Sequence, residues 1–151
     1  MPYPHKSDSS EQRQAENDIF SLVQQELGIA LKQCEKLPLS HNGSYIQPDF
    51  YSKDPLIIGE IFSHVGKPKK AQDNKIANDI LKMLVYEKIT GVKHRKIIAV
   101  CDKEEYDKLK GSSALAEAIR QFEIDLMLVT IPDALRHKLI SAQERQRMIN
   151  E

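Results

Sequence analysis

The sequence has few cysteines, no long apolar run and no excess of either charge. Its two cysteines, Cys34 and Cys101, are too few for a disulfide framework or a four-thiolate zinc site. Both fall in apolar segments, which predicts buried thiols in a reducing cytoplasm. No apolar run approaches the roughly 20 residues that span a bilayer, and the N-terminus lacks the apolar core of a secretory signal. The 22 basic and 22 acidic residues cancel, which argues against a protein that coats nucleic acid through overall positive charge. We therefore expect a cytoplasmic protein without membrane contact.

Several motifs of enzyme sites are also missing. There is no glycine-rich phosphate loop and no dinucleotide fingerprint, which argues against enzymes that use nucleotide cofactors. The five histidines show no HExxH or closely paired spacing, which argues against a zinc site. The serines lack a GxSxG turn, so a hydrolase triad has no support.

The composition that remains is typical of one globular domain. A chain of 151 residues, 40% of them hydrophobic and 29% charged, is long enough to bury one substantial core. We expect a flexible N-terminus over residues 1–9 and a single domain over residues 10–151.

Apolar periodicity along the chain alternates between helix and strand. A three-and-four spacing predicts helices, and short runs of aromatic and β-branched residues predict strands, the first two of them paired antiparallel. The expected helices cover about 10–34, 71–89, 103–121 and from Pro132 onward, and the expected strands cover 44–52, 56–63, 96–102 and 125–131. This order predicts an α/β fold with three layers, in which helices cover both faces of a mixed central sheet.

Positive charge is concentrated in the middle of the sequence. Residues 63–96 contain nine Lys/Arg and three Asp/Glu, a net charge of +6, which is enough to neutralise several phosphates. The alternative is that these lysines occupy solvated loops and helix faces.

Two carboxylates stand on the paired strands expected at 44–52 and 56–63. Asp49 follows Pro48, and Glu60 lies inside the apolar run LIIGEIF, where a buried carboxylate needs a partner or a metal to offset its desolvation. Gly59 beside it leaves space for a backbone or a phosphate. A tight hairpin in the right register brings both acids to one region, as Mg²⁺ or Mn²⁺ requires. The alternative places Asp49 at a turn and Glu60 toward solvent.

This arrangement resembles the PD-(D/E)XK nuclease superfamily, whose fold is the restriction-endonuclease-like fold. The resemblance covers residues 16–102: a helix, Pro-Asp on a strand, an acid in an apolar strand, an amphipathic helix and another strand. It implies that Asp49 and Glu60 hold one or two Mg²⁺ or Mn²⁺ ions for hydrolysis of a phosphodiester. It also implies a nucleic-acid partner, with DNA favoured over RNA, and allows a homodimer.

One position departs from the superfamily pattern. The lysine expected two residues after the acid is replaced by Phe62, which supplies neither charge nor a proton. Lys75, on the following helix, is the candidate replacement, and His64 is a second one. Gln72 starts a stripe of residues at helical spacing that resembles a polar helix motif of some nuclease branches. The alternative for this stripe is the solvated side of an amphipathic helix.

The loop HVGKPKK between the acid strand and this helix contains the expected nucleic-acid-binding residues Lys67, Lys69 and Lys70. The sequence thus predicts a metal-dependent nuclease. Two alternatives remain open: a catalytically inactive nuclease-fold domain that binds nucleic acid or a protein partner, and a structural or interaction domain whose carboxylates bind nothing.

Overall fold

The structure, a computed structural model, describes the backbone of residues 4–150 and the side chains of residues 10–149. Its centre is a mixed sheet with the strand order β1-β4-β5-β6-β7, and β2 pairs with β3 in a separate small sheet. In the main sheet β4 is antiparallel to β1 and β5, while β5, β6 and β7 are parallel. The strands are β1 (Lys32–Gln33), β2 (Leu37–Pro38), β3 (Tyr45–Ile46), β4 (Phe50–Lys53), β5 (Leu56–Phe62), β6 (Arg95–Val100) and β7 (Asp125–Leu128).

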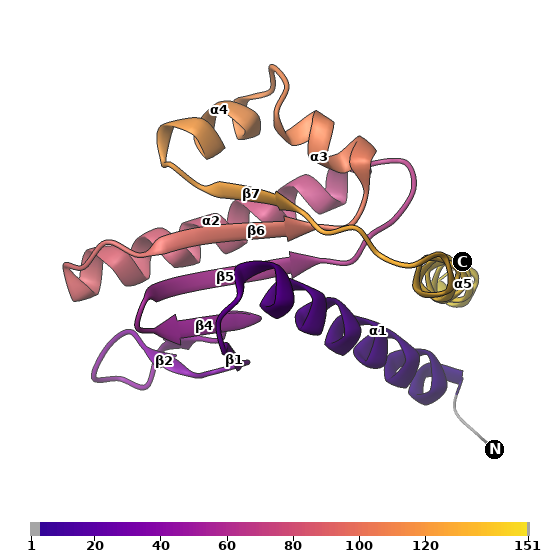
Figure 1. Cartoon of the computed structure of the whole chain (residues 1–151), viewed down its shortest axis with the longest axis horizontal. Coiled ribbons are helices and arrows are strands. Elements are labelled where there is room, and N and C mark those ends of the chain that lie inside the picture. The colour runs from indigo at the N-terminus through magenta and orange to yellow at the C-terminus, as the bar shows by residue number, and fades with distance from the viewer. Residues whose placement is uncertain (1–3, 151) are drawn as a thin grey trace.

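Helices cover both faces of the main sheet, which gives three layers (Figure 1). The elements on one face are α1 (Pro4–Leu27) and α5 (Asp133–Asn150), and those on the other are α2 (Lys70–Thr90), α3 (Lys103–Leu109) and α4 (Ala114–Gln121). The expected α/β fold with a mixed sheet is confirmed.

The alternation of side chains along β5 explains why both faces are covered. Ile57 and Ile61 are buried in the cluster with α1 and α5, whereas Ile58 and Phe62 are buried in the cluster with α2. Because successive side chains of a strand point to opposite faces, Glu60 lies on the α2 face together with Ile58 and Phe62.

The ends of the elements follow from local chemistry. Gly91 ends α2 in the left-handed conformation at φ 70°, and its N–H donates to the Glu87 carbonyl, as helix C-termini often do. The Asp102 side chain caps α3 by accepting from the N–H of Glu104, and Ser113 caps α4 in the same way.

Three expected elements have different bounds. The first helix ends at Leu27 and not near residue 34, because Gly28 adopts φ 70° and the Gln24 side chain accepts a hydrogen bond from the N–H of Leu31. The strand expected over 44–52 is split, because Tyr45–Ile46 pairs with β2 and only the residues from Phe50 pair with β5.

The third difference is the helix expected over 103–121, which is two helices. They are separated at residues 110–113, where Ser113 begins α4 as its cap. The backbone of residues 4–9 belongs to α1, and residues 1–3 lie outside the described residues, so the expected flexibility of 1–9 and the domain bounds stay predictions.

Candidate metal and nucleic-acid site

The strand register brings Asp49 and Glu60 together. In the β4–β5 ladder Phe50 is opposite Gly59, so the next residues outward are Asp49 and Glu60, which face each other across the two strands. Oδ2 of Asp49 accepts a hydrogen bond of 2.7 Å from the N–H of Ile61, which fixes the Asp49 carboxylate to the backbone of β5. Both acids are partly buried. The hairpin therefore forms the carboxylate pair that the sequence predicts.

The environment of Glu60 strongly disfavours its ionised form. Burial, the charge of Asp49, a hydrogen bond with the Asp49 side chain and the charge of Asp79 raise the pKa of Glu60 to about 10, against a smaller opposing contribution from the Asp49 backbone. Two carboxylates at hydrogen-bond distance share a proton or require a cation between them. A divalent cation bound to the pair would offset this electrostatic cost.

Asp79 of α2 is a third acid, close enough to act electrostatically on this pair. Its side chain is buried, and burial raises its pKa, against the opposing charges of Lys82 and Lys75. The nearby charge of Asp49 raises the pKa further. No site role was predicted for Asp79. The available signal was its helical spacing from Lys75, which puts it on the stripe that starts at Gln72.

Lys75 lies beside the position of the missing lysine. Its Nζ is 5.4 Å from the centroid of the buried Phe62 ring, which is a cation–π distance. Lys75 is exposed on α2, and its charge acts on Asp79. A cation therefore stands over Phe62, although it comes from a different element.

The other two candidates on this side have weaker links to the pair. Gln72 is half-buried in the first turn of α2, and its N–H donates to the Lys69 carbonyl. Nε2 of His64 lies 3.0 Å from the Lys67 carbonyl oxygen, so His64 contacts the loop. Among the described residues, no hydrogen bond or ion pair joins either of them to Asp49 or Glu60.

The loop that follows β5 is anchored at its base and exposed at its tip. The Gly66 N–H donates to the Asp102 carboxylate at 2.6 Å, and the Val65 N–H and carbonyl both bond to the Gln143 side chain. Arg136 of α5 also contacts Asp102, at 2.8 Å. Lys67 and Lys69 of the loop, and Lys70 at the first position of α2, are exposed and make no ion pair with any described residue.

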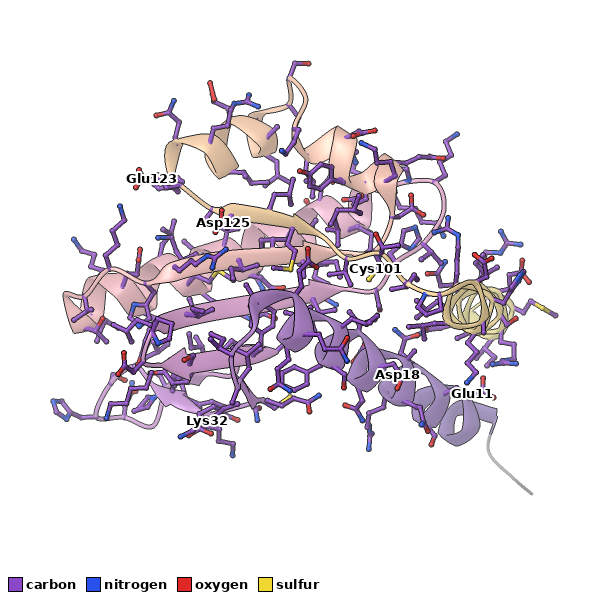
Figure 2. The ribbon with its side chains drawn as sticks, viewed as in Figure 1. Glu11, Asp18, Lys32, Cys101, Glu123 and Asp125 are labelled. Atoms are coloured by element: carbon purple, nitrogen blue, oxygen red, sulfur yellow. The ribbon has the colours of Figure 1, made fainter. Side chains whose placement is uncertain are left out.

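The positive segment 63–96 does not form one surface. Lys93 and Arg95 pair with Glu123 and Asp125 at the β7 edge, where Figure 2 labels both acids. Lys96 is buried. The C-terminal end of the segment is thus neutralised within the protein, whereas the loop and α2 carry its exposed lysines.

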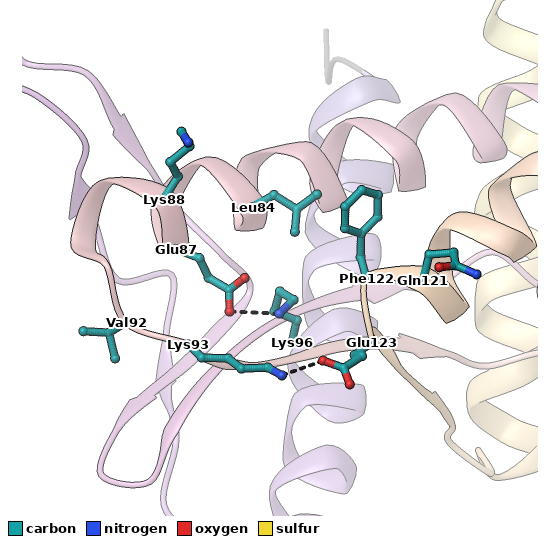
Figure 3. A pocket seen from close by; sticks show the side chains of 9 residues that line it. All are labelled: Leu84, Glu87, Lys88, Val92, Lys93, Lys96, Gln121, Phe122 and Glu123. Atoms are coloured by element: carbon teal, nitrogen blue, oxygen red, sulfur yellow. Dashed lines mark hydrogen bonds and ion pairs between the residues drawn. The ribbon is translucent and has the colours of Figure 1, made fainter.

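A cavity of about 490 Å³ lies within this neutralised region, and Lys93, Lys96 and Glu123 are among the residues that line it (Figure 3). At its base Nζ of Lys96 lies 2.8 Å from Glu87 of α2, and at its rim Lys93 contacts Glu123 at 2.5 Å. None of the predicted site residues lines it.

Gly59 and Cys34 differ from their predicted roles. A Cβ on Gly59 would lie 2.0 Å from Cζ of Phe50, so the glycine makes room for this ring and not for a backbone or a phosphate. Cys34 is exposed, not buried, because the chain leaves the helix at Leu27 and reaches β1 at the sheet edge; Cys101 is buried as expected.

The donor set fits an ion that prefers oxygen. Mg²⁺ and Mn²⁺ are held by one or two carboxylates together with water and substrate oxygens, and the Asp49–Glu60 pair supplies such carboxylates. Within residues 10–149, no group of three or more His, Cys, Asp or Glu side chains is arranged as a metal site. The candidate is therefore a two-carboxylate site with Asp79 beside it.

Comparisons with protein-family models, curated proteins and solved structures found no match to this chain. Among the described helices, none is long and apolar enough to cross a bilayer.

Proposed function

We propose that this protein is a divalent-metal-dependent nuclease with a restriction-endonuclease-like core, which hydrolyses phosphodiester bonds of nucleic acid. The observation that carries the proposal is the Asp49–Glu60 pair, in which the pKa of Glu60 is raised to about 10. A carboxyl group with a strongly perturbed pKa, such as Glu60, that faces a second carboxylate on the adjacent strand is typical of functional sites.

In this proposal Asp49 and Glu60 hold Mg²⁺ or Mn²⁺. When bound, the ion activates a water and stabilises negative charge on the phosphate. The Ile61 N–H holds the Asp49 carboxylate in place through its 2.7 Å hydrogen bond. Lys75 takes the place of the strand lysine and donates to phosphate oxygens, since its Nζ is exposed above Phe62. Gln72, on the first turn of the same helix, supports this side of the site.

Nucleic acid is the substrate class that the surrounding charge favours, and DNA is favoured over RNA. The loop lysines follow directly after β5, the strand that carries Glu60. They therefore lie beyond the carboxyl end of this strand, which is also the end near which Glu60 stands. They contact phosphates without reading sequence. Charge reversal of all three is expected to weaken binding and to lower the slope of log K against log salt by about 2–3. The residues to reverse are Lys67, Lys69 and Lys70.

Phe62 favours a second candidate, a catalytically inactive domain that binds nucleic acid. A buried aromatic side chain stands where the superfamily has its lysine. In this case the basic loop binds nucleic acid whether or not a metal is present, and no substrate is cleaved.

The test is cleavage of single- and double-stranded DNA and RNA in Mn²⁺, with EDTA as the metal-free control. Wild type is compared with Glu60→Gln, which keeps the side-chain shape and removes its charge, and with Glu104→Gln. Glu104 is an exposed acid on α3, so this matched variant removes one carboxylate outside the candidate pair.

Cleavage by wild type and by Glu104→Gln, lost in EDTA and in Glu60→Gln, is the expected result. A Glu60→Gln protein that cuts at the wild-type rate contradicts the metal assignment. Binding without cleavage, across all metals and substrates, favours the inactive domain.

A further inference from the structure

A groove of about 440 Å³ opens beside Asp49 on the other side from α2. It lies between α1 and the edge of the sheet. Arg13, Glu16 and Asn17 contribute from α1, Gln33 and Cys34 from the end of β1, and Asp49 and Ile61 from the hairpin. Its volume is near the lower end of the roughly 300–1,000 Å³ typical of small-ligand pockets.

The groove is continuous with the carboxylate pair. Asp49 lines the groove and also faces Glu60 across the β4–β5 ladder. The backbone N–H of Cys34 donates to the Asp49 carbonyl oxygen at 3.3 Å, which joins the end of β1 to the start of β4 at this groove. A substrate whose reacting phosphate is at the pair therefore has its adjoining part at the mouth of this groove.

The charge of the groove selects which part of a substrate enters it. One cation, Arg13, lies among two carboxylates, Glu16 and Asp49, so the lining has a net charge of −1. A phosphate is repelled from such an interior, whereas an uncharged base or sugar is not. The neutral part of a nucleotide is the group that fits.

Polar groups suited to a base edge line the groove. The Gln33 Nε2 donates to the Asn17 Oδ1 at 2.7 Å, which holds the two amides side by side across α1 and β1. This bond leaves the Asn17 amide nitrogen as a donor and the Gln33 amide oxygen as an acceptor. Adjacent donors and acceptors match the edge of an unpaired base.

We propose that this groove binds one unstacked nucleoside of a single-stranded nucleic acid, next to the phosphate that a divalent cation at Asp49 and Glu60 would hold. The inference rests on the proposed function and specifies its substrate: a base within a duplex must be unpaired and unstacked to enter, while a single strand avoids most of that cost. The protein thus prefers single strands.

Cys34 provides the test, because it lines the groove and is exposed, while Cys101 is buried with its pKa raised to about 12. The full chain is treated with N-ethylmaleimide at pH 8.5 in Ca²⁺, and alkylation is followed by mass spectrometry. The probes are oligothymidylate and its duplex with oligoadenylate, and binding of each is measured separately by fluorescence anisotropy. Cys34→Ser identifies the alkylated residue.

Oligothymidylate at ten times its Kd is expected to slow alkylation of Cys34 about tenfold, with little effect of the duplex at equal saturation. Binding of oligothymidylate without protection, or equal protection by the duplex, overturns the groove assignment and leaves the proposed nuclease site standing. Failure of both probes to bind overturns the groove assignment and the proposed nucleic-acid substrate together.

A pair of variants gives a second measurement. Asn17→Leu removes the amide from the groove, and Gln14→Leu makes a comparable change on an exposed α1 position that does not line it. Asn17→Leu is expected to weaken oligothymidylate binding about three- to tenfold, and Gln14→Leu to leave it unchanged. Equal affinities of the two variants contradict the assignment.

Discussion

Glu60→Gln is expected to make the metal-free protein more stable at high pH. The pKa of Glu60 is raised to about 10 in the folded protein, against an ordinary value of 4.5 in the unfolded chain. Between these values the folded state holds one more proton than the unfolded state, so the free energy of unfolding falls as pH rises, by up to about 1.4 kcal/mol per pH unit. Glutamine does not titrate and has no such loss.

The magnitude follows from the pH interval. From pH 6 to pH 9 the wild type is expected to lose about 2–4 kcal/mol relative to Glu60→Gln, after a discount for the solvent that reaches this partly buried residue. Groups that do not interact with Glu60, Cys101 among them, cancel in the comparison. Mn²⁺ at 100 times its Kd is expected to restore about 2.7 kcal/mol to the wild type only.

Urea unfolding of both proteins in EDTA, at one-unit steps from pH 6 to pH 9, measures this difference. The effect of the metal is measured by urea unfolding of both proteins at pH 8 in Mn²⁺. Equal pH slopes for wild type and Glu60→Gln would refute the reasoning, because they would mean that Glu60 is ionised in the folded protein at no cost.

Four further substitutions test other parts of the structure. Gly59→Ala is expected to lower the free energy of unfolding by about 2–4 kcal/mol in urea, because its Cβ would overlap the Phe50 ring. Lys75→Ala is expected to slow cleavage by about 100-fold while Mn²⁺ binding is retained; cleavage at the wild-type rate would remove Lys75 from the site. Glu105→Gln is expected to raise Tm, because both oxygens of this buried carboxylate lack a hydrogen-bond partner among the described residues and burial raises its pKa. Asp102→Ala is expected to lower the free energy of unfolding by about 3–5 kcal/mol in urea, since it removes the buried carboxylate and the contacts that this group makes.

The sequence was sufficient to predict the alternation of helices and strands and the pairing of the two strands at which Asp49 and Glu60 stand. Periodicity and turn residues are local signals, and Pro55 between two β-rich runs marks the hairpin whose register places Asp49 opposite Glu60. The end of α2 at Gly91 is likewise local, because a left-handed residue there closes the helix.

Other features depend on contacts between distant parts of the chain. Tyr45–Ile46 pairs with β2, and the paired segment around Leu37 is too short to show periodicity. The exposure of Cys34 depends on where α1 ends and how β1 joins the sheet edge. The neutralisation of Lys93 by Glu123 joins residues 30 positions apart, which a count of charges along the chain does not show.

The sequence predicted the two carboxylates of the candidate site, but only some of the residues around them. Asp79 faces Glu60 because α2 packs on that face of β5, and the spacing along α2 alone does not distinguish this face from a solvated one. The approach of Lys75 to Phe62 depends on the same packing.

Mn²⁺ binding by the purified protein tests the central claim most directly. Titration calorimetry at pH 8 on wild type, Asp49→Asn, Glu60→Gln and the control Glu104→Gln separates the candidate pair from other acids. We expect saturable binding by wild type and by Glu104→Gln, and its loss in Asp49→Asn and Glu60→Gln. Equal binding by all four proteins, or none by wild type, would contradict the assignment of Asp49 and Glu60 as the metal-binding pair.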